Sequence, residues 1–221
     1  MEYDGSELFW KNLYTKEDMM KHIVWEATTD DKFNEKTSLE CYKICKALGL
    51  KDSTKSVLDF GCGIGRLAKY IASHTSCRVA GVDVSQPMIN QARLYCEGTG
   101  VEFVHMLNGF TIPAPNDCVD AVYSHIVLQH IHKYKVYFIF KEFYRVLTSG
   151  GLGFIQLPNF KKCLPEYDMY ASDYVNYDSC QISAMNFWFP EEAGMLLERV
   201  GFKIISVEEE GTDFYVLFRK P

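Results

Sequence analysis

The segment 57–66, which reads VLDFGCGIGR, constrains the fold of this chain more than any other feature of its sequence. A short apolar strand leads into a turn with glycine at every second position, and a helical pattern begins directly after the turn. Gly61 and Gly63 allow the backbone to turn sharply and to approach a ligand closely, while Gly65 allows a helix to pack tightly against the strand. This order of elements predicts the first unit of a parallel α/β sheet, with a ligand at the turn.

Strands and helices alternate along the following part of the chain. The predicted strands cover 55–60, 78–82, 101–106, 119–124 and 152–157, and the predicted helices between them cover 66–73, 85–96 and 134–147. Such alternation is typical of right-handed βαβ units, which form a parallel sheet with helices on both faces.

The end of the chain breaks this alternation. A helix begins at Pro190 and ends at Gly201, and two strands follow at 202–208 and 213–218. Their connection is too short for a parallel crossover and predicts an antiparallel hairpin. We therefore predict an α/β fold, a three-layer sandwich whose mostly parallel seven-stranded sheet contains a reversed C-terminal strand.

The charge and cysteine content exclude several classes of protein. Lys and Arg number 23 against 29 Asp and Glu, a net charge of −6, whereas binding of nucleic acid needs clustered positive charge. No apolar run approaches the roughly 20 residues of a membrane-spanning helix, and the N-terminus lacks a secretory pattern. The eight cysteines contain no CxxC pair and predict reduced thiols. We expect a cytoplasmic protein with a small-molecule partner and with neither nucleic acid nor membrane.

Two acidic residues indicate which ligand the turn would take. Asp83 ends the second strand about 20 residues after the glycines, where a carboxylate can accept both hydroxyl protons of a ribose. Asp59 precedes the turn, where it would repel a diphosphate but could accept a hydrogen bond from an ammonium group. Arg66 stands where a dinucleotide-binding turn has a glycine. The turn therefore favours a nucleoside with a cationic amino-acid end.

These segments resemble the class I S-adenosylmethionine-dependent methyltransferases. Residues 57–72 resemble the first motif of that family, and 79–93 (VAGVDVSQPMINQAR) resemble the segment that follows it. Further matches are DAVYS at 120–124, VLQHI at 127–131, RVLTSGG at 145–151 and IQLP at 155–158. The resemblance covers about 55–158 and is greatest to the small-molecule enzymes. It implies a Rossmann-like fold and an enzyme that transfers a methyl group from S-adenosyl-L-methionine to an oxygen or nitrogen of a small acceptor by in-line displacement, leaving S-adenosyl-L-homocysteine.

The resemblance also implies which residues hold the cofactor. Those that would frame its methionine part are Asp59, Gly61, Cys62, Gly63 and Gly65. Asp83 would hold the ribose, and those near the adenine would be Val84, Met88, Asn108 and Gly109. Ser124 and His125 would lie near the sulfonium. Many relatives carry Asp near position 108, but the amide of Asn108 also offers a donor and an acceptor.

His125 and His130 are the candidate catalytic residues. Both follow the fourth predicted strand, and sites in α/β proteins form at the carboxyl ends of strands. Imidazole is the side chain best suited to accept a proton near neutral pH. The alternative for His130 is that it only fixes its loop through a hydrogen bond. The two histidines lack a nearby carboxylate in the sequence, so we predict no metal site.

Aromatic residues outside the resemblance are the candidate contacts of the acceptor. Helical patterns at 7–27 and 37–49 predict a helical cap over 1–50, before the cofactor-binding core at 55–158. Residues 159–189 form an insertion, interpreted as a lid over the acceptor, and 190–221 form the closing helix and hairpin of the single domain 1–221. The candidate substrate residues are Tyr14, Trp25, Tyr167, Tyr170 and Tyr174. The tyrosines of the insertion recur at helical spacing, which is equally compatible with packing on the sheet or with a dimer contact.

Three other functions stay open at this point. A methyltransferase acting on a macromolecule would need a surface that the charge of −6 does not indicate. The Asn/Asp-Pro-Pro-Tyr/Phe signature of enzymes that methylate exocyclic amines of bases or glutamine amides is also absent after the fourth strand. A noncatalytic cofactor-binding partner subunit would carry the same turn. A nicotinamide-dependent oxidoreductase is disfavoured by Arg66 and Asp59.

Overall fold

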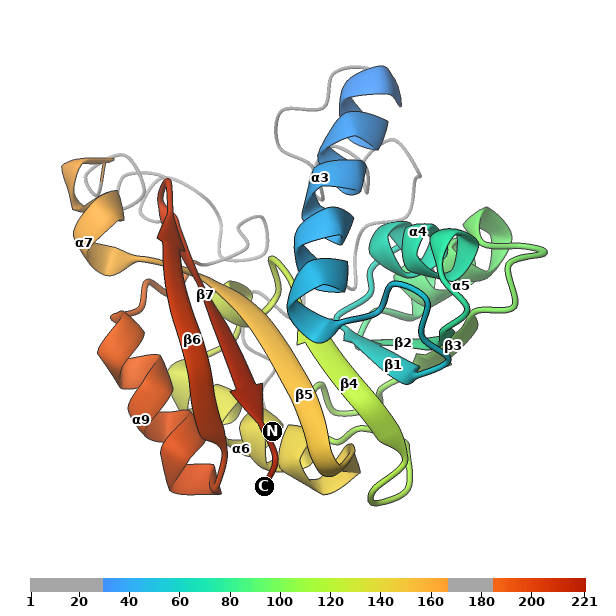
Figure 1. Ribbon diagram of the computed structural model, residues 1–221. Helices are drawn as coiled ribbons and strands as arrows, with labels where there is room; N and C mark the ends of the chain where they lie inside the picture. The colour runs from blue at the N-terminus through green and yellow to red at the C-terminus, as the bar shows by residue number, and fades with distance from the viewer. Residues whose placement is uncertain (1–29, 167–184) are drawn as a thin grey trace.

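The computed structural model describes residues 30–166 and 185–221. Within these ranges one seven-stranded sheet has the order β3-β2-β1-β4-β5-β7-β6 (Figure 1). The strands are β1 (Ser56–Phe60), β2 (Arg78–Asp83), β3 (Glu102–His105), β4 (Val119–Ser124), β5 (Leu147–Pro158), β6 (Lys203–Glu210) and β7 (Asp213–Arg219). β7 runs antiparallel to β5 and β6, and all other neighbours are parallel. The predicted α/β class, the mostly parallel sheet and its reversed strand are confirmed.

Helices cover both faces of the sheet. They are α3 (Asp30–Leu48), α4 (Arg66–His74), α5 (Gln86–Tyr95), η1 (Leu128–His130), α6 (Lys133–Val146), α7 (Phe160–Cys163), η2 (Leu164–Glu166) and α9 (Pro190–Val200). The buried apolar residues form two clusters, one shared with α3, α4 and α5 and the other with α6 and α9. Alternate residues of β1 divide between them, since Val57 lies in the first cluster and Leu58 and Phe60 in the second. The fold therefore has the three layers predicted from the alternation.

The helix predicted over 37–49 begins earlier, at Asp30. Phe33 and Thr37 are both buried and continue its packed face toward the N-terminus. The hydroxyl of Thr37 donates to the carbonyl of Phe33 at 2.6 Å, inside the same helix. The helical pattern predicted at 7–27 lies outside the described residues.

The fifth strand also begins earlier than predicted, at Leu147 rather than at 152. Leu147 pairs with Val119 of β4, and the Gly150 amide donates to the carbonyl of Lys220 at 2.9 Å. Gly150 and Gly151, which lie between the predicted helix and the predicted strand, therefore belong to β5, and α6 ends at Val146.

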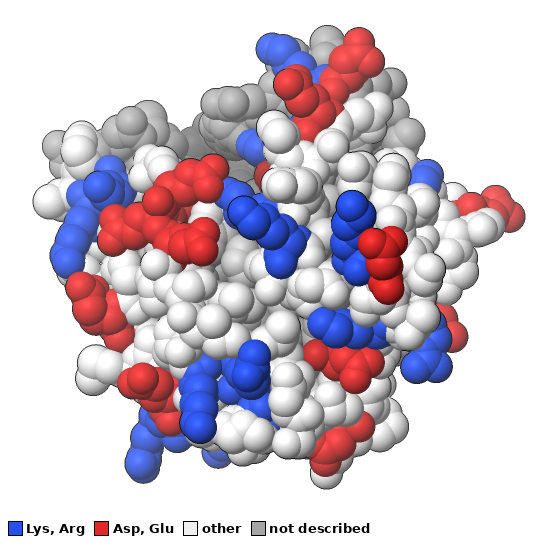
Figure 2. Space-filling model, viewed as in Figure 1, with Lys and Arg blue, Asp and Glu red and all other residues white. Residues whose placement is uncertain are grey.

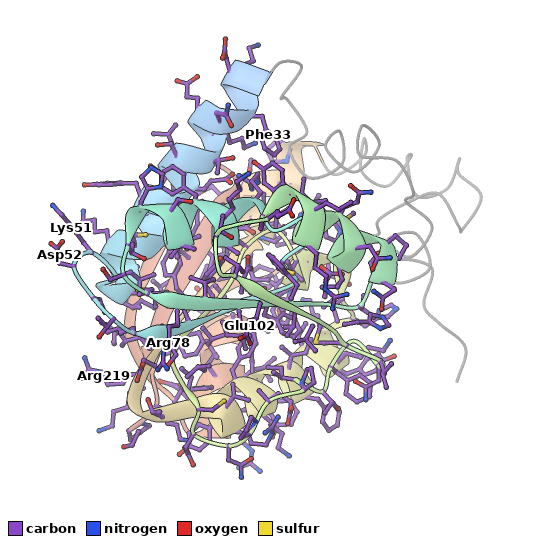
Figure 3. The ribbon with its side chains drawn as sticks, turned by 90° about the vertical axis from the view of Figure 1, so that its right-hand side faces the viewer. Phe33, Lys51, Asp52, Arg78, Glu102 and Arg219 are labelled. Atoms are coloured by element: carbon purple, nitrogen blue, oxygen red, sulfur yellow. The ribbon has the colours of Figure 1, made fainter. Side chains whose placement is uncertain are left out.

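The parallel strands β1, β2 and β4 end at one edge of the sheet, which is where α/β proteins bind their ligands. α3 packs on α4 and β5 and rises beside this edge (Figure 1). In the side view of Figure 3, Phe33 of α3 lies above the sheet, away from Arg78 at the start of β2. α3 therefore brings its N-terminal half toward the carboxyl ends of the strands.

The surface on the face shown in Figure 2 carries interspersed acidic and basic side chains. The acidic ones gather at the β6–β7 hairpin, where Glu208, Glu209 and Glu210 are exposed. No helix in the described ranges is long and apolar enough to cross a membrane.

Candidate active site

A cleft opens at the carboxyl ends of β1, β2 and β4 and encloses about 1090 Å³, counted out to its open mouth. Its walls are the glycine turn, the end of β2 and the loops that follow β3 and β4. The predicted residues that line it are Asp59, Gly61, Cys62, Gly63, Asp83, Val84, Met88, Asn108, Gly109, His125 and His130. The structure thus brings most of the predicted site residues to one cavity.

Neighbouring side chains leave no room for a Cβ atom at two glycines of the turn, Gly61 and Gly65. Gly61 has a φ of +77°, and a Cβ atom there would lie 2.4 Å from the side chain of Val127. Gly65 has a φ of +79°, and a Cβ atom there would meet Phe103 at 2.6 Å and Cys96 at 2.7 Å. Gly61 therefore allows the turn to approach the loop after β4. Gly65 instead faces β3 and the end of α5, and it is not among the residues that line the cleft.

Asp83 ties the end of β2 to the glycine turn. One carboxylate oxygen accepts a hydrogen bond from the Gly63 amide at 2.9 Å, and the other accepts one from the Ser85 amide at 2.8 Å. Burial raises the pKa of Asp83, although these amides oppose the shift. Each oxygen keeps a second lone pair, so the carboxylate can also accept two hydroxyl groups, as a ribose requires.

Asp59 places a buried carboxyl at the end of β1. Only 3% of this residue is exposed, and it lines the cleft. Burial raises its pKa to about 7, with a further contribution from Asp83, and the Tyr123 phenol and the Arg66 guanidinium oppose the shift. A negative charge here is poorly solvated and gains from a cation beside it. The position fits an ammonium group and disfavours a phosphate.

Asn108 lines the cleft, but its side chain forms hydrogen bonds within its own loop. Its Oδ1 accepts hydrogen bonds from the amides of Phe110 at 3.3 Å and Thr111 at 2.8 Å, and its Nδ2 donates to the Thr111 hydroxyl at 3.1 Å. Both lone pairs of the oxygen are used in this way. One N–H of the amide therefore remains for a ligand, rather than the donor and acceptor pair expected from the sequence.

The loop that carries Asn108 is fastened by Arg145 of α6. The guanidinium donates to the carbonyl of Ile112 at 2.8 Å and to that of Ala114 at 2.7 Å. Glu142 pairs with Arg145 at 2.7 Å and accepts the Ile112 amide at 2.9 Å. These contacts from α6 hold in place the loop after β3, which forms one wall of the cleft.

His125 contacts an acidic side chain that was not predicted from the sequence. Its Nε2 atom lies 3.3 Å from Oε1 of Glu40 on α3, and Oε2 of Glu40 lies 2.6 Å from Nη1 of Arg66. The exposed fractions of these side chains are 6% for His125, 12% for Glu40 and 4% for Arg66. Although burial acts to raise it, His125 and Arg66 hold the pKa of the Glu40 carboxyl at about 2. A fixed negative charge therefore lies beside the His125 ring.

His130 lines the same cleft from η1. Its amide donates to the carbonyl of Val127 at 2.9 Å, and its Nε2 atom lies 3.4 Å from Nε2 of Gln129. Both predicted histidines therefore lie where they could contact a ligand.

Ser124 has a different place from the one implied by the resemblance. Its hydroxyl donates to the carbonyl of Phe60 at 3.1 Å and joins β4 to β1. The residue is almost fully buried and is not among those that line the cleft. The candidate substrate residues lie outside the described residues: Tyr14, Trp25, Tyr167, Tyr170 and Tyr174.

Some residues of the cleft were not predicted as site residues. They are Phe60, Arg66, Leu67, Met106, Phe110, Ile126, Val127, Ile131 and Lys135. Most of them adjoin a predicted residue in the sequence. Their position near the end of a predicted strand is the sequence feature that could have predicted them. Glu40 had no such signal, because it lies on α3, remote in sequence from every recognised motif.

Comparison with known proteins gives a family match and two curated relatives. Residues 57–151 match the family described as "Methyltransferase domain". The sterol 24-C-methyltransferase of Pneumocystis carinii is 28% identical over 191 residues, which make up 83% of this chain and 48% of that protein. The cyclopropane-fatty-acyl-phospholipid synthase of Escherichia coli K12 is 29% identical over 157 residues, or 70% of this chain and 39% of that protein. The chain thus matches less than half the length of either relative.

Solved structures show the same fold. A protein of Pyrococcus horikoshii OT3 superposes with a TM-score of 0.70 at 20% identity, covering 89% of this chain and 94% of that one. An S-adenosylmethionine-dependent methyltransferase of Mesorhizobium loti superposes with a TM-score of 0.66 at 18% identity, covering 81% of this chain and 97% of that one.

Proposed function

We propose that the chain is an S-adenosyl-L-methionine-dependent methyltransferase acting on a small-molecule acceptor, because residues 57–151 match a methyltransferase family and the fold is shared with solved methyltransferase structures. The observation that carries the proposal is the pair of buried carboxyls, Asp59 and Asp83, on either side of the glycine turn in one cleft. The first suits an ammonium group and the second suits the hydroxyl groups of a ribose. A ligand with both groups matches the cofactor of this family.

The cofactor is assigned to the cleft as follows. Asp59 takes the amino end of the methionine part, Asp83 takes the ribose, and the apolar side chains of Val84 and Met88 lie toward the adenine. The main alternative, a nicotinamide dinucleotide, would bring a diphosphate against Asp59, where a second negative charge is unfavourable.

The chemistry of the reaction limits what the protein must supply. The bound cofactor supplies an electrophilic methyl group, which the acceptor takes by in-line displacement. The chain's own task is then to position the acceptor, exclude water and take up a proton where the acceptor carries one. Apolar residues such as Met106, Ile126 and Ile131 line the cleft and exclude water. His125 and His130 are the proposed proton acceptors.

The acceptor is proposed to be a small molecule methylated at oxygen or nitrogen. A second candidate, methylation at carbon, is favoured by the name of one relative, a sterol 24-C-methyltransferase. Within the proposed single domain 1–221, the cap at 1–50 and the lid at 159–189 would enclose the acceptor, next to the core at 55–158 and the closing segment 190–221. A cytoplasmic location stays a prediction from the cysteine pattern.

A thermal shift measurement tests the cofactor first. The unfolding temperature is measured with S-adenosyl-L-methionine, S-adenosyl-L-homocysteine and NAD in parallel. A ligand at about 100 times its dissociation constant stabilises the fold by roughly 2.7 kcal/mol, which corresponds to several degrees for a chain of this size. We expect a rise with the two adenosyl ligands and none with NAD. A rise with NAD alone, or with none of the three, would contradict the proposal.

Transfer of a labelled methyl group tests the acceptor class. The chain and labelled cofactor are incubated in three parallel reactions. These contain the small-molecule extract, the protein or the RNA of one cell lysate. We expect label in the small-molecule fraction. Label in protein or RNA would show a macromolecular acceptor, and binding of cofactor without transfer to any fraction would support a noncatalytic subunit.

A further inference from the structure

We propose that the acceptor is an organic anion with an apolar body, and that its negatively charged group is held by Lys135 at the start of α6. This inference rests on the proposed function and names the class of acceptor for the same cleft. Lys135 lines the cleft and is half-buried there.

The part of the cleft that is left for the acceptor follows β4. Asp59 and Asp83, which are assigned to the cofactor, belong to β1 and β2. The lining residues that follow β4 form what we call the acceptor wall: His125, Ile126, Val127, His130, Ile131 and Lys135. These six include one lysine and two histidines and no Asp or Glu. The acidic groups of the cleft and its lysine therefore come from different elements.

The charges at the acceptor wall favour a negatively charged acceptor. The proposed cofactor carries a positive sulfonium, and Lys135 adds a second positive charge. A protonated amine would be repelled by both charges, whereas an anion is attracted by both. An uncharged apolar acceptor would displace water from the ammonium group of Lys135 and offer it no hydrogen-bond acceptor in exchange, which is unfavourable.

The place of Lys135 is not explained by the stability of α6. The N-terminal end of a helix carries a partial positive charge, so its first turn favours acidic side chains and disfavours lysines. The first turn of α6 contains Lys133 and Lys135 and no acidic residue. Lys133 pairs with Glu192 of α9 at 2.7 Å, which offsets its cost to the helix. Lys135 lies at the cleft instead, where a bound anion would be stabilised by the ammonium group and by the helix end together.

The rest of the acceptor wall suits an apolar body. Ile126, Val127 and Ile131 line it, and Phe110 lines the cleft from the loop after β3. Val127 also packs against Gly61, so the acceptor wall adjoins the glycine turn that is assigned to the cofactor. Apolar walls exclude water and lower the effective dielectric constant, which strengthens the attraction between a lysine and an anion. An acceptor with an apolar body and one anionic group matches both features.

Lys135 has a binding role in this proposal and forms no covalent bond. The methylated atom and the anionic group are different parts of the acceptor, and the ammonium group holds only the second. Because this contact is the same before and during methyl transfer, its loss should raise KM more than it lowers kcat.

Fractionation of a small-molecule extract tests the charge of the acceptor before its identity is known. The extract of a cell lysate is passed over an anion-exchange resin. The retained and unretained fractions are then incubated with the full chain and S-adenosyl-L-methionine labelled in its methyl group. We expect more transfer of label with the retained fraction. Equal or greater transfer with the unretained fraction would overturn this inference and leave the proposed function standing, whereas transfer with neither would overturn both.

Phosphatase treatment of the retained fraction identifies the anionic group. If the acceptor is a phosphate ester, treatment should move the acceptor activity to the unretained fraction. If the group is a carboxylate or a sulfate, the activity should stay in the retained fraction. Either result supports an anionic acceptor and says which anion Lys135 holds.

Lys135→Met removes the charge and keeps the apolar stem of the side chain. With a limiting amount of the retained fraction, the initial rate should fall by about tenfold or more, because the acceptor loses a hydrogen bond to a charged group. Lys135→Arg should recover part of the rate. The matched control is Lys141→Met, at an exposed position of the same helix outside the lining of the cleft, which should keep the rate. An unchanged rate in Lys135→Met would overturn the proposal.

Salt dependence separates anion binding from a structural role of Lys135. Added salt screens the attraction between the lysine and an anion. At saturating cofactor, the transfer rate of the unsubstituted chain should therefore fall with ionic strength, and that of Lys135→Met should fall less. Calorimetry should find the same affinity for S-adenosyl-L-homocysteine in both. Equal salt dependence, or weaker cofactor binding by Lys135→Met, would show that the lysine supports the fold of the cleft and would overturn the proposal.

Discussion

The two sides of the cleft are built by different means. On the side of β1 and β2, the wall is made by the backbone of the glycine turn and by carboxyls at the strand ends, as in the hydrogen bond between Asp83 and the Gly63 amide. On the side of β4, it depends on contacts between distant segments. His125 is held by Glu40 from α3, and the Ile126 amide is held by Gln156 from β5. The first side is defined by local chain conformation and the second by tertiary packing.

This difference has an energetic consequence. The side of β1 and β2, where the cofactor is proposed to bind, is called the cofactor side. Burial raises the pKa of its two carboxyls, Asp59 and Asp83, and a bound ligand would stabilise their charged forms. The other side holds a carboxylate, Glu40, whose partners already keep it ionised. The cofactor side should therefore be less stable when empty, whereas the β4 side should be preformed.

Asp59→Asn is expected to show the largest effect. In the folded chain the pKa of Asp59 is about 7, against an ordinary value of 3.8. The folded state binds this proton more tightly, so the contribution of Asp59 to stability is fully present below the ordinary pKa and is lost as the pH rises through about 7. The side chain of asparagine does not ionise, so its contribution to stability does not change with pH in this way. The free energy of unfolding should therefore rise by on the order of a few kcal/mol at about pH 8 and by less at about pH 5.

Urea unfolding at the two pH values measures this difference, and calorimetry measures the binding of S-adenosyl-L-methionine by the same variant. Binding should weaken, because the ammonium group loses its carboxylate. The control is Asp31→Asn, at an exposed position of α3. Equal stabilisation at both pH values would show that the buried charge of Asp59 is not the cause.

Asp83→Ala should weaken cofactor binding by roughly 1–3 kcal/mol, or about 5–150-fold, because ribose hydroxyls and the Gly63 amide lose their acceptor. Calorimetric titration with S-adenosyl-L-homocysteine measures the change. Glu102→Ala, an exposed acid at the start of β3, is the matched control. If Asp83→Ala binds as tightly as the unsubstituted chain, Asp83 does not belong to the ribose site.

The same contrast explains which parts of the molecule could be predicted from sequence. The strand, the glycine turn and the acid after β2 are local patterns, and so was the short connection of the β6–β7 hairpin. The start of β5 was missed because Leu147 becomes a strand residue only through its pairing with Val119. Hydrogen bonds from side chain to backbone decided the place of Ser124 and the use of the Asn108 amide. A local sequence pattern does not predict these hydrogen-bond partners.

Glu40 is the clearest case of what a single sequence leaves out. It lies on a helix whose pattern predicts only a packed face, and its charge is explained by Arg66 and His125, which are distant in the chain. His125 itself could be predicted, because it directly follows a strand. The predicted half of this pair is thus the one next to a strand end, and the missed half is the one brought by a covering helix.

Arg145→Met should produce the smallest effect and tests whether the two sides are independent. The guanidinium fastens the loop after β3 through the carbonyls of Ile112 and Ala114, and methionine keeps the apolar stem without these bonds. Cofactor affinity should fall by about 1 kcal/mol, the net value of a typical lost hydrogen bond. Arg78→Met, an exposed arginine at the start of β2, is the control. The nuclear magnetic resonance signal of the His125 ring should not move, because Glu40 and Tyr215, which contact this ring, lie on α3 and β7. If it moves together with affinity, the two sides of the cleft are one coupled unit.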